Sequence, residues 1–194
     1  MTVLLIAGSP SERSRSAALL DSVSQRLTAR GATVERLLIR DLSPQALLLA
    51  DTSHLSIRKA IDQVQRARAV VIATPVYKAA YSGVLKVFLD LLAQNALQGK
   101  TILPLATGGS PHHMLALDYA LRPVLQSLAA RHILPGVYVT DAQVVLTPEG
   151  AHTISADIAG RLDDSVATLV AEGLKLAPAT GFAPVHFSQV RHSV

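Results

Sequence analysis

The chain has 194 residues, of which 49% are hydrophobic and 16% are charged, and its formal net charge is +4. This composition excludes a disordered chain and suits one α/β domain, with apolar residues left over for a buried interface between subunits. The absence of cysteine excludes disulfides, thiol nucleophiles and cysteine-bound metals. No basic stripe, signal peptide or membrane-spanning run is visible, so we expect a cytoplasmic protein that binds neither nucleic acid nor membranes.

Predicted strands and helices alternate along the first half of the chain. Residues 3–7 form a short apolar run before Gly-Ser-Pro, which is typical of a buried parallel strand. A helix is predicted over 14–30, with apolar residues on one face and Gly31 at its end. The next predicted elements are a strand over 33–39, a helix marked by Ile57, Ile61 and Val64, and a strand over 69–73 that Thr74-Pro75 closes.

The second half continues this alternation. Residues 84–92 are apolar on nearly every side, which predicts a helix buried by its own sheet and by a partner subunit. The following predicted elements are a strand over 101–106, a helical stretch from about 112 to 131, a strand over 132–139, and a helix marked by Ile158, Leu162, Val166 and Leu169 with Ser155 as a candidate cap. We expect a single domain over 1–175 and a C-terminal tail over 176–194.

Five buried strands separated by helices predict an α/β fold with a doubly wound parallel sheet flanked by helices. Such sheets bind ligands outside the carboxyl ends of their strands, where the strand order reverses. The loops after the first, third and fourth predicted strands are therefore the candidate site.

The first loop, residues 8–16, favours an anion site. Four serine hydroxyls and two arginines, Arg13 and Arg15, lie where a helix N-terminus presents free N–H groups. Helix capping and a Gly-Pro turn would account for one or two of the serines only. Because the dinucleotide motif G-x-G-x-x-G and the triphosphate motif G-x-x-x-x-G-K-[ST] are both absent, a mononucleotide such as FMN fits best.

The other two loops carry features that suit a flat ring. In residues 74–83, Pro75 keeps the backbone extended and Tyr77 offers an aromatic face, although Tyr77 could also belong to the core or an interface. The adjacent Gly108 and Gly109 let backbone amides approach a planar ligand, although they could also form a plain turn. His112 and His113 point about 100° apart on a helix and lack a third ligand, so no metal site is predicted.

A proline lies inside the helical stretch that follows. Pro123 lacks an N–H group and would clash with the carbonyl of Tyr119, four residues earlier. A kink or π-bulge near Tyr119 would relieve this clash, and such bulges often mark functional sites. Alternatively, one helix ends at Arg122 and another starts at Pro123.

Taken together, the segments LLIAGSPSERSRS, VVIATPVYKAAYSGVLKVFLDLL, LPLATGGSPHH and LDYALRPVL resemble the NAD(P)H-dependent FMN reductases of flavodoxin-like fold. Within that family they are similar to the reductase of the two-component alkanesulfonate monooxygenase system. The resemblance covers about residues 1 to 140 and implies strand order 2-1-3-4-5.

The resemblance also implies the site residues. It implies a tetramer, a dimer of dimers, in which a π-helix at the interface carries Tyr119 near the flavin of a neighbour, where it governs flavin exchange. The implied contacts are Ser9, Ser14, Arg15 and Ser16 with the FMN phosphate, Pro75, Val76 and Tyr77 with the isoalloxazine, and Thr107, Gly108 and Gly109 with its pyrimidine edge.

The implied activity is the reduction of FMN by NADPH, with NADH also possible. Reduced FMN would then leave and supply an FMN-dependent monooxygenase that desulfonates organosulfonates. Three other interpretations stay open: a quinone or azo reductase that retains its FMN, a non-enzymatic electron carrier of flavodoxin type, and an α/β interaction module without flavin. The carrier is disfavoured because such proteins are usually acidic, whereas this chain is basic.

Overall fold

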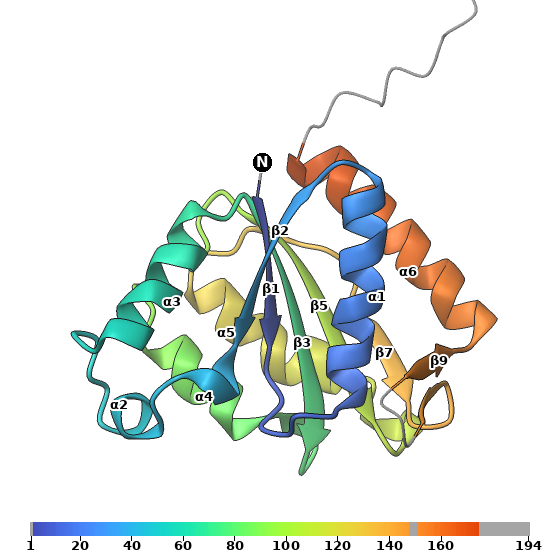
Figure 1. Cartoon of the computed structure of the whole chain (residues 1–194), viewed down its shortest axis with the longest axis horizontal. Helices are drawn as coiled ribbons and strands as arrows, with labels where there is room; N and C mark the ends of the chain where they lie inside the picture. Colours follow the sequence, from blue (N-terminus) through green and yellow to red (C-terminus); the bar gives the residue numbers. More distant parts are fainter. Residues whose placement is uncertain (1, 148–150, 175–194) are drawn as a thin grey trace, which may run out of the picture.

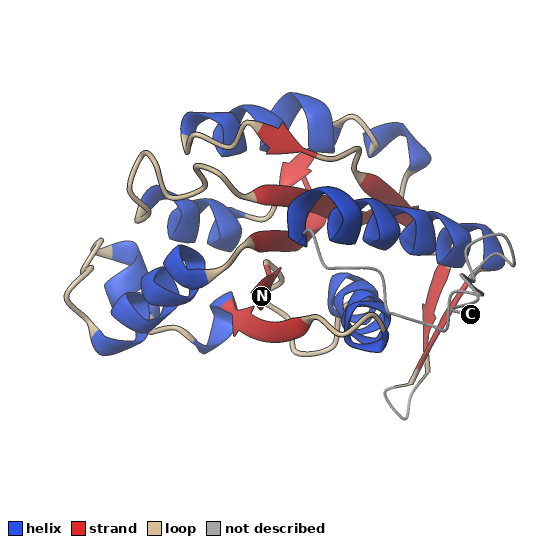
Figure 2. Ribbon diagram, turned by 90° about the horizontal axis from the view of Figure 1, so that it is seen from above, coloured by secondary structure: helices blue, strands red, loops and turns tan. Residues whose placement is uncertain are grey.

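A mostly parallel β-sheet forms the centre of the fold, and helices cover both of its faces (Figures 1 and 2). The computed structural model describes residues 2–147 and 151–174, so the predicted tail over 176–194 lies outside the described residues. The strands pair in the order β2-β1-β3-β5-β6, and β7 also pairs with β5. The parallel strands are β1 (Thr2–Ala7), β2 (Thr33–Leu38), β3 (Ala69–Tyr77), β5 (Thr101–Gly108), β6 (His132–Ile133) and β7 (Val137–Thr140).

This order confirms the predicted flavodoxin-like sheet of order 2-1-3-4-5, except that the fifth strand is in two pieces. The prediction of a continuous strand over 132–139 is wrong. Pro135 has no N–H group to add to a ladder. Gly136 packs so tightly that a Cβ there would lie 2.7 Å from Cδ1 of Leu117. The chain therefore leaves the ladder between β6 and β7.

The third strand is longer than predicted. Thr74-Pro75 does not close it, because β3 continues to Tyr77 and folds back as β4 (Ala80–Tyr81). Pro75 lies beyond the last pair of the β1–β3 ladder, so its missing N–H group leaves no gap there. Lys78 and Ala79 form the two-residue turn with φ values of 49° and 66°. This left-handed conformation suits the tight turn of a hairpin, but it is unfavourable for residues other than Gly and Asn.

The helices begin and end close to the predicted residues. Ser14 caps α1 by accepting a hydrogen bond from the N–H of Ala17, and Gly31 follows with a φ of 79°. Ser155 is at the N-cap of α6, but its hydroxyl bonds Asp157 and does not cap the backbone. The sequence analysis did not predict α2, η1, η4 or the β8–β9 hairpin. The bounds are α1 (Arg15–Ala29), η1 (Ile39–Asp41), α2 (Pro44–Leu48), α3 (Leu55–Arg66), α4 (Gly83–Asp90), α6 (Ala156–Thr168), η4 (Leu169–Leu174), β8 (Val144–Leu146) and β9 (His152–Ile154).

The stretch predicted as one long helix divides into three consecutive pieces. These are a 3₁₀ turn η2 (Pro111–His113), a π-helix η3 (Ala116–Leu121) and an α-helix α5 (Arg122–Ser127). The N–H of Arg122 donates to the carbonyl of Leu117, and Arg122 itself is helical, so η3 passes into α5 without a break. The π-bulge predicted from Pro123 is confirmed. The helix ends at Ser127, earlier than predicted, and Ala129 has a φ of 64°.

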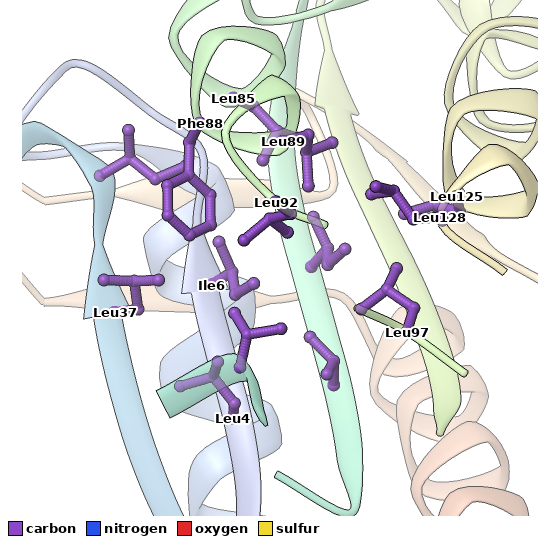
Figure 3. Packing of buried hydrophobic residues seen from close by; sticks show 14 of the residues in the cluster. Leu4, Ile6, Leu37, Leu85, Phe88, Leu89, Leu92, Leu97, Leu125 and Leu128 are labelled. Atoms are coloured by element: carbon purple, nitrogen blue, oxygen red, sulfur yellow. The ribbon is translucent and has the colours of Figure 1, made fainter. Parts of the chain in front are cut away.

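Alternation along the strands divides the core between the two faces of the sheet. On one face, Leu4 and Ile6 of β1 pack with Phe88 and Leu85 of α4 and with α3 and α5 (Figure 3). On the other face, side chains of β1 and β3 pack with α1 and α6. One side of α4 is buried in this core, and Val84, Val87 and Leu91 are only partly buried. In the described ranges, no helix is long and apolar enough to cross a bilayer.

Candidate functional site

A cavity of about 250 Å³ lies at the carboxyl ends of β1, β3 and β5, the edge to which the arrowheads of β1 and β3 point in Figure 1. Three loops meet there because parallel strands end at one edge of a sheet. The lining residues are Ser9, Ser11, Arg13, Ser14 and Arg15 of the first loop, Pro75, Val76 and Tyr77 of the second, Thr107, Gly108 and Gly109 of the third, and Asp141 and Leu146 beyond β7.

Nine of the ten residues that were predicted to bind a cofactor line this cavity. The exception is Ser16, which is buried and whose hydroxyl lies 3.2 Å from that of Ser14. Ser16 therefore contacts Ser14 but does not line the cavity. The cavity brings together the three loops that the sequence analysis selected; which ligand they hold stays a prediction.

The first loop brings polar groups to the N-terminus of α1. Ser9 Oγ accepts a hydrogen bond from the N–H of Ser11 at 3.1 Å, which curls the loop. The guanidinium of Arg40 supports it from outside by donating to the carbonyl of Ser11 at 3.1 Å. Ser14 caps one N–H group of the first turn of α1, and the free N–H groups and dipole of that turn favour an anion. This end of the cavity suits a phosphate group.

Arg15, the first residue of α1, is held toward β7 and β8. Its Nη1 lies 3.4 Å from Oδ2 of Asp141, and its Nε donates to the carbonyl of Val144 at 3.1 Å. Both side chains of the ion pair are partly exposed, at 38% for Arg15 and 47% for Asp141. An anionic and a cationic group therefore both face the cavity.

A buried serine joins the first and second loops. Ser82 accepts a hydrogen bond from the N–H of Leu85 at 3.3 Å and so caps α4. Its hydroxyl donates to the carbonyl of Gly8, and its own N–H donates to Oγ1 of Thr74 at 3.0 Å. Thr74 and Ser82 are each 1% exposed, so these bonds are shielded from water. They fix the first loop relative to the strand that carries Tyr77.

Tyr77 ends β3 next to the strained turn at Lys78 and Ala79. Tyr77 is 47% exposed, whereas Tyr138 and Phe88 are buried. Because Tyr77 lines the cavity and leaves its ring open, it offers a surface for a planar ligand.

The third loop is a close-packed turn over Tyr138 of β7. A Cβ on Gly108 would collide with the hydroxyl of Tyr138 and lie 3.3 Å from its Cζ. At Gly109, by contrast, the nearest atom to an added Cβ is Oδ2 of Asp141 at 3.7 Å, so packing within the protein does not require a glycine there. The absence of a side chain at Gly109 keeps the cavity wall open to a ligand. A phosphate-bearing ligand with a flat ring fits the hydrogen-bond donors of the first loop and the open wall at Gly109.

The hydroxyl of Tyr138 supports the third loop by donating to the carbonyl of Ser110 at 2.6 Å. Burial of this side chain raises its pKa above 10.0, and the negative charge of Asp141 raises it further. Tyr138 therefore stays protonated and donates its hydrogen bond at neutral pH.

Tyr119 lies apart from this cavity. It is on η3, which packs against β4, and its side chain is 79% exposed. Met114 and Leu115, at the start of the same segment, are also exposed. The role of Tyr119 toward the flavin of a neighbouring subunit stays a prediction.

The sequence analysis missed Asp141 and Leu146 as lining residues. Asp141 lies two residues after the fifth predicted strand, so the rule that selected the other loops could have found it. Leu146 is on β8, an element that carried no recognisable signal.

A second hollow of about 250 Å³ lies between α3 and the segment after α4, lined by residues that include Ile61, Leu92 and Lys100. It is at the amino ends of the strands. Lys100 donates to the carbonyls of Gln65 and Ala67 at 2.9 and 2.7 Å, so its charge is engaged by the backbone. This hollow lacks the helix N-terminus and the glycine loop of the first cavity.

Comparison with known proteins gives consistent results. Residues 1–144 match the family model described as NADPH-dependent FMN reductase. An FMN reductase (NADPH) of Escherichia coli is 47% identical over 145 residues, which are 75% of this chain and 76% of that protein. A protein of the same name from Pseudomonas putida is 44% identical over 171 residues, 87% of this chain and 86% of the relative. The crystal structure of an NADH:FMN oxidoreductase in its apo form superimposes with a TM-score of 0.80 at 38% identity, covering 92% of this chain and 91% of the other.

Proposed function

Because the chain belongs to the NADPH-dependent FMN reductase family, we propose that it reduces FMN at the cavity formed by its three loops and passes reduced FMN to a separate FMN-dependent monooxygenase. The observation that carries the proposal is the convergence of an anion-binding helix N-terminus, an exposed tyrosine and an open glycine loop on that one cavity.

The first loop would hold the phosphate of FMN. Ser9, Ser14 and Arg15 offer hydroxyl and guanidinium donors, and the N-terminus of α1 adds N–H groups and a positive dipole end. Ser16 would act through its hydrogen bond with Ser14. The two arginines of this loop would also attract the anionic substrates FMN and NADPH.

The second and third loops would orient the ring. Pro75, Val76 and Tyr77 supply an apolar and aromatic wall. Thr107, Gly108 and Gly109 bring backbone groups to the opposite side, where the polar edge of the ring would find hydrogen-bonding partners. Ser82 fixes the second loop relative to the first loop, which would hold the phosphate.

Bound flavin supplies the redox chemistry, because it accepts a hydride from a reduced nicotinamide. The residues of this chain then have three tasks: they bind the phosphate, they hold the ring with one face accessible, and they limit the access of water. Hydride transfer needs no acid–base pair from the protein. NADPH is the proposed donor, following the family.

Release of flavin is the part of the proposal that involves other subunits. We propose a tetramer in which Tyr119 of one subunit lies near the flavin site of another and governs flavin exchange. The exposure of Tyr119 and the partly buried apolar residues of α4 support a buried interface on this side of the sheet. The partner's substrate would be an organosulfonate, following the sequence resemblance to the reductase of the alkanesulfonate system.

A dialysis cell tests the transfer of reduced FMN. The protein, NADPH and FMN are placed on one side, and an alkanesulfonate monooxygenase component with its sulfonate on the other. We expect sulfite to be released, because reduced FMN diffuses between the compartments. Consumption of NADPH with flavin that stays bound through gel filtration, and no sulfite, would contradict the proposal and favour a reductase that retains its FMN.

A further inference from the structure

The carboxylate of Asp141 occupies a position where an anion-binding site would be expected to have only donors. It lines the same cavity as Ser9, Ser14 and Arg15, and it lies 3.4 Å from the guanidinium of Arg15. We propose that Asp141 is a built-in competitor for the FMN phosphate, which keeps FMN binding weak enough for flavin to exchange. This inference rests on the proposed function, because it assumes that FMN binds in this cavity.

The turn that carries Asp141 is fixed by its own hydrogen bonds. The N–H of Gln143 donates to the carbonyl of Thr140, and the N–H and hydroxyl of Thr140 each bond Oε1 of Gln143 at 3.0 Å. Gln143 is held in turn by Oδ2 of Asp157 on α6 at 3.1 Å. These bonds hold the turn from which Asp141 faces Arg15.

Arg15 makes two contacts with other residues of the protein. Its Nη1 faces Asp141, and its Nε donates to the carbonyl of Val144. A phosphate that takes a hydrogen bond from this guanidinium must share it with Asp141 or displace that carboxylate. A phosphate monoester carries a charge of about −1.5 to −2 at pH 7, so it also meets direct repulsion from Asp141. Both effects weaken phosphate binding.

The opposite reading is that Asp141 assists binding by holding Arg15 in place. The two interpretations predict opposite changes in FMN affinity when Asp141 is neutralised. If Asp141 competes, its neutral isostere should bind FMN more tightly; if it only positions Arg15, the isostere should bind FMN more weakly. Riboflavin, which has the same ring and no phosphate, separates an effect on the phosphate from an effect on the ring.

The experiment measures dissociation constants of FMN and riboflavin for the unmodified protein and Asp141→Asn by fluorescence quenching. For Asp141→Asn we expect about tenfold tighter FMN binding at low salt, a riboflavin affinity within about twofold of the unmodified protein, and an FMN effect that shrinks as salt is added. Faster exchange in the unmodified protein should appear as a larger dissociation rate for FMN. Asp141→Ser serves as a second variant in case the amide forms a new contact.

Asp163→Asn is the matched control. Asp163 pairs with Arg26 at the other end of α1 at 2.9 Å, is 51% exposed, and is absent from the lining of the cavity. Its FMN affinity should not change. Unchanged or weaker FMN binding in Asp141→Asn and Asp141→Ser, or equal tightening of riboflavin, would overturn the inference. Failure of the unmodified protein to bind FMN would overturn the proposed function itself, and this inference with it.

Discussion

The hydroxyl of Tyr138 lies so close to Gly108 that a Cβ on this glycine would collide with it. The third loop and β7 therefore pack too closely for a side chain at residue 108. Gly108→Ala must displace either the loop or the tyrosine, and we expect it to lower the free energy of unfolding by about 1–3 kcal/mol. Urea denaturation measures this. Gly160→Ala is the control: Gly160 is in α6 with open space around it, and an alanine there should be neutral or stabilising by up to about 1 kcal/mol. Equal stability of Gly108→Ala and Gly160→Ala would contradict the packing argument.

Tyr138 should make stability fall at alkaline pH. Its pKa in the folded protein is raised above 10.0 by burial and then by Asp141, so the folded state holds this proton more tightly than the unfolded state does. The free energy of unfolding should therefore decline as pH rises above 10 and should not depend on this group near neutral pH.

Tyr138→Phe isolates this contribution. The variant loses the hydrogen bond to Ser110, which should cost about 0.5–1.5 kcal/mol at pH 7. Between pH 9 and 11 it should lose less stability than the unmodified protein, although Tyr81, whose pKa burial also raises, leaves part of the decline in place. Parallel urea titrations across this range measure the difference, and identical slopes would refute the assignment.

Ser82 should contribute to stability and to the shape of the site together. Ser82→Ala removes the cap of α4 and leaves the buried carbonyl of Gly8 without this donor, which should cost about 1–3 kcal/mol. FMN affinity should fall because the first loop loses its link to β3. Ser155→Ala is the matched control, since Ser155 is at an N-cap but makes no capping bond, and its cost should be about 0.5 kcal/mol or less. Equal losses in the two variants would show that the link is unimportant.

Tyr119 should matter for flavin retention and little for folding. Because its side chain is 79% exposed, Tyr119→Ala should change the free energy of unfolding of a subunit by no more than about 0.5 kcal/mol. Flavin retention and turnover should change if Tyr119 reaches the site of a neighbouring subunit. Leu121→Ala in the same π-helix, at a fully buried residue, should instead cost about 2–5 kcal/mol. Unchanged steady-state kinetics and FMN affinity in Tyr119→Ala would refute its proposed role.

Features set by residues close together in sequence could be predicted. The start of α1 near Ser14, its end at Gly31 and a π-bulge near Tyr119 follow from local chemistry, and the structure confirms them. The sheet order and the three converging loops followed from the alternation of strands and helices and from the family resemblance.

Features set by distant residues could not be predicted. The break at Gly136 depends on Leu117 and Pro104, and the ion pair of Asp141 depends on Arg15, which is far from it in the sequence. Residues 74–77 stay in the sheet because β5 and β4 pair with them, which no local signal indicates.

The most direct test of the central claim is steady-state oxidation of NADPH and NADH by the purified apoprotein, with and without added FMN. The account predicts NADPH oxidation that saturates with FMN, a lower rate with NADH, and flavin recovered free in solution after turnover. Failure of added FMN to stimulate oxidation of either nucleotide would contradict it and leave a carrier or a binding module.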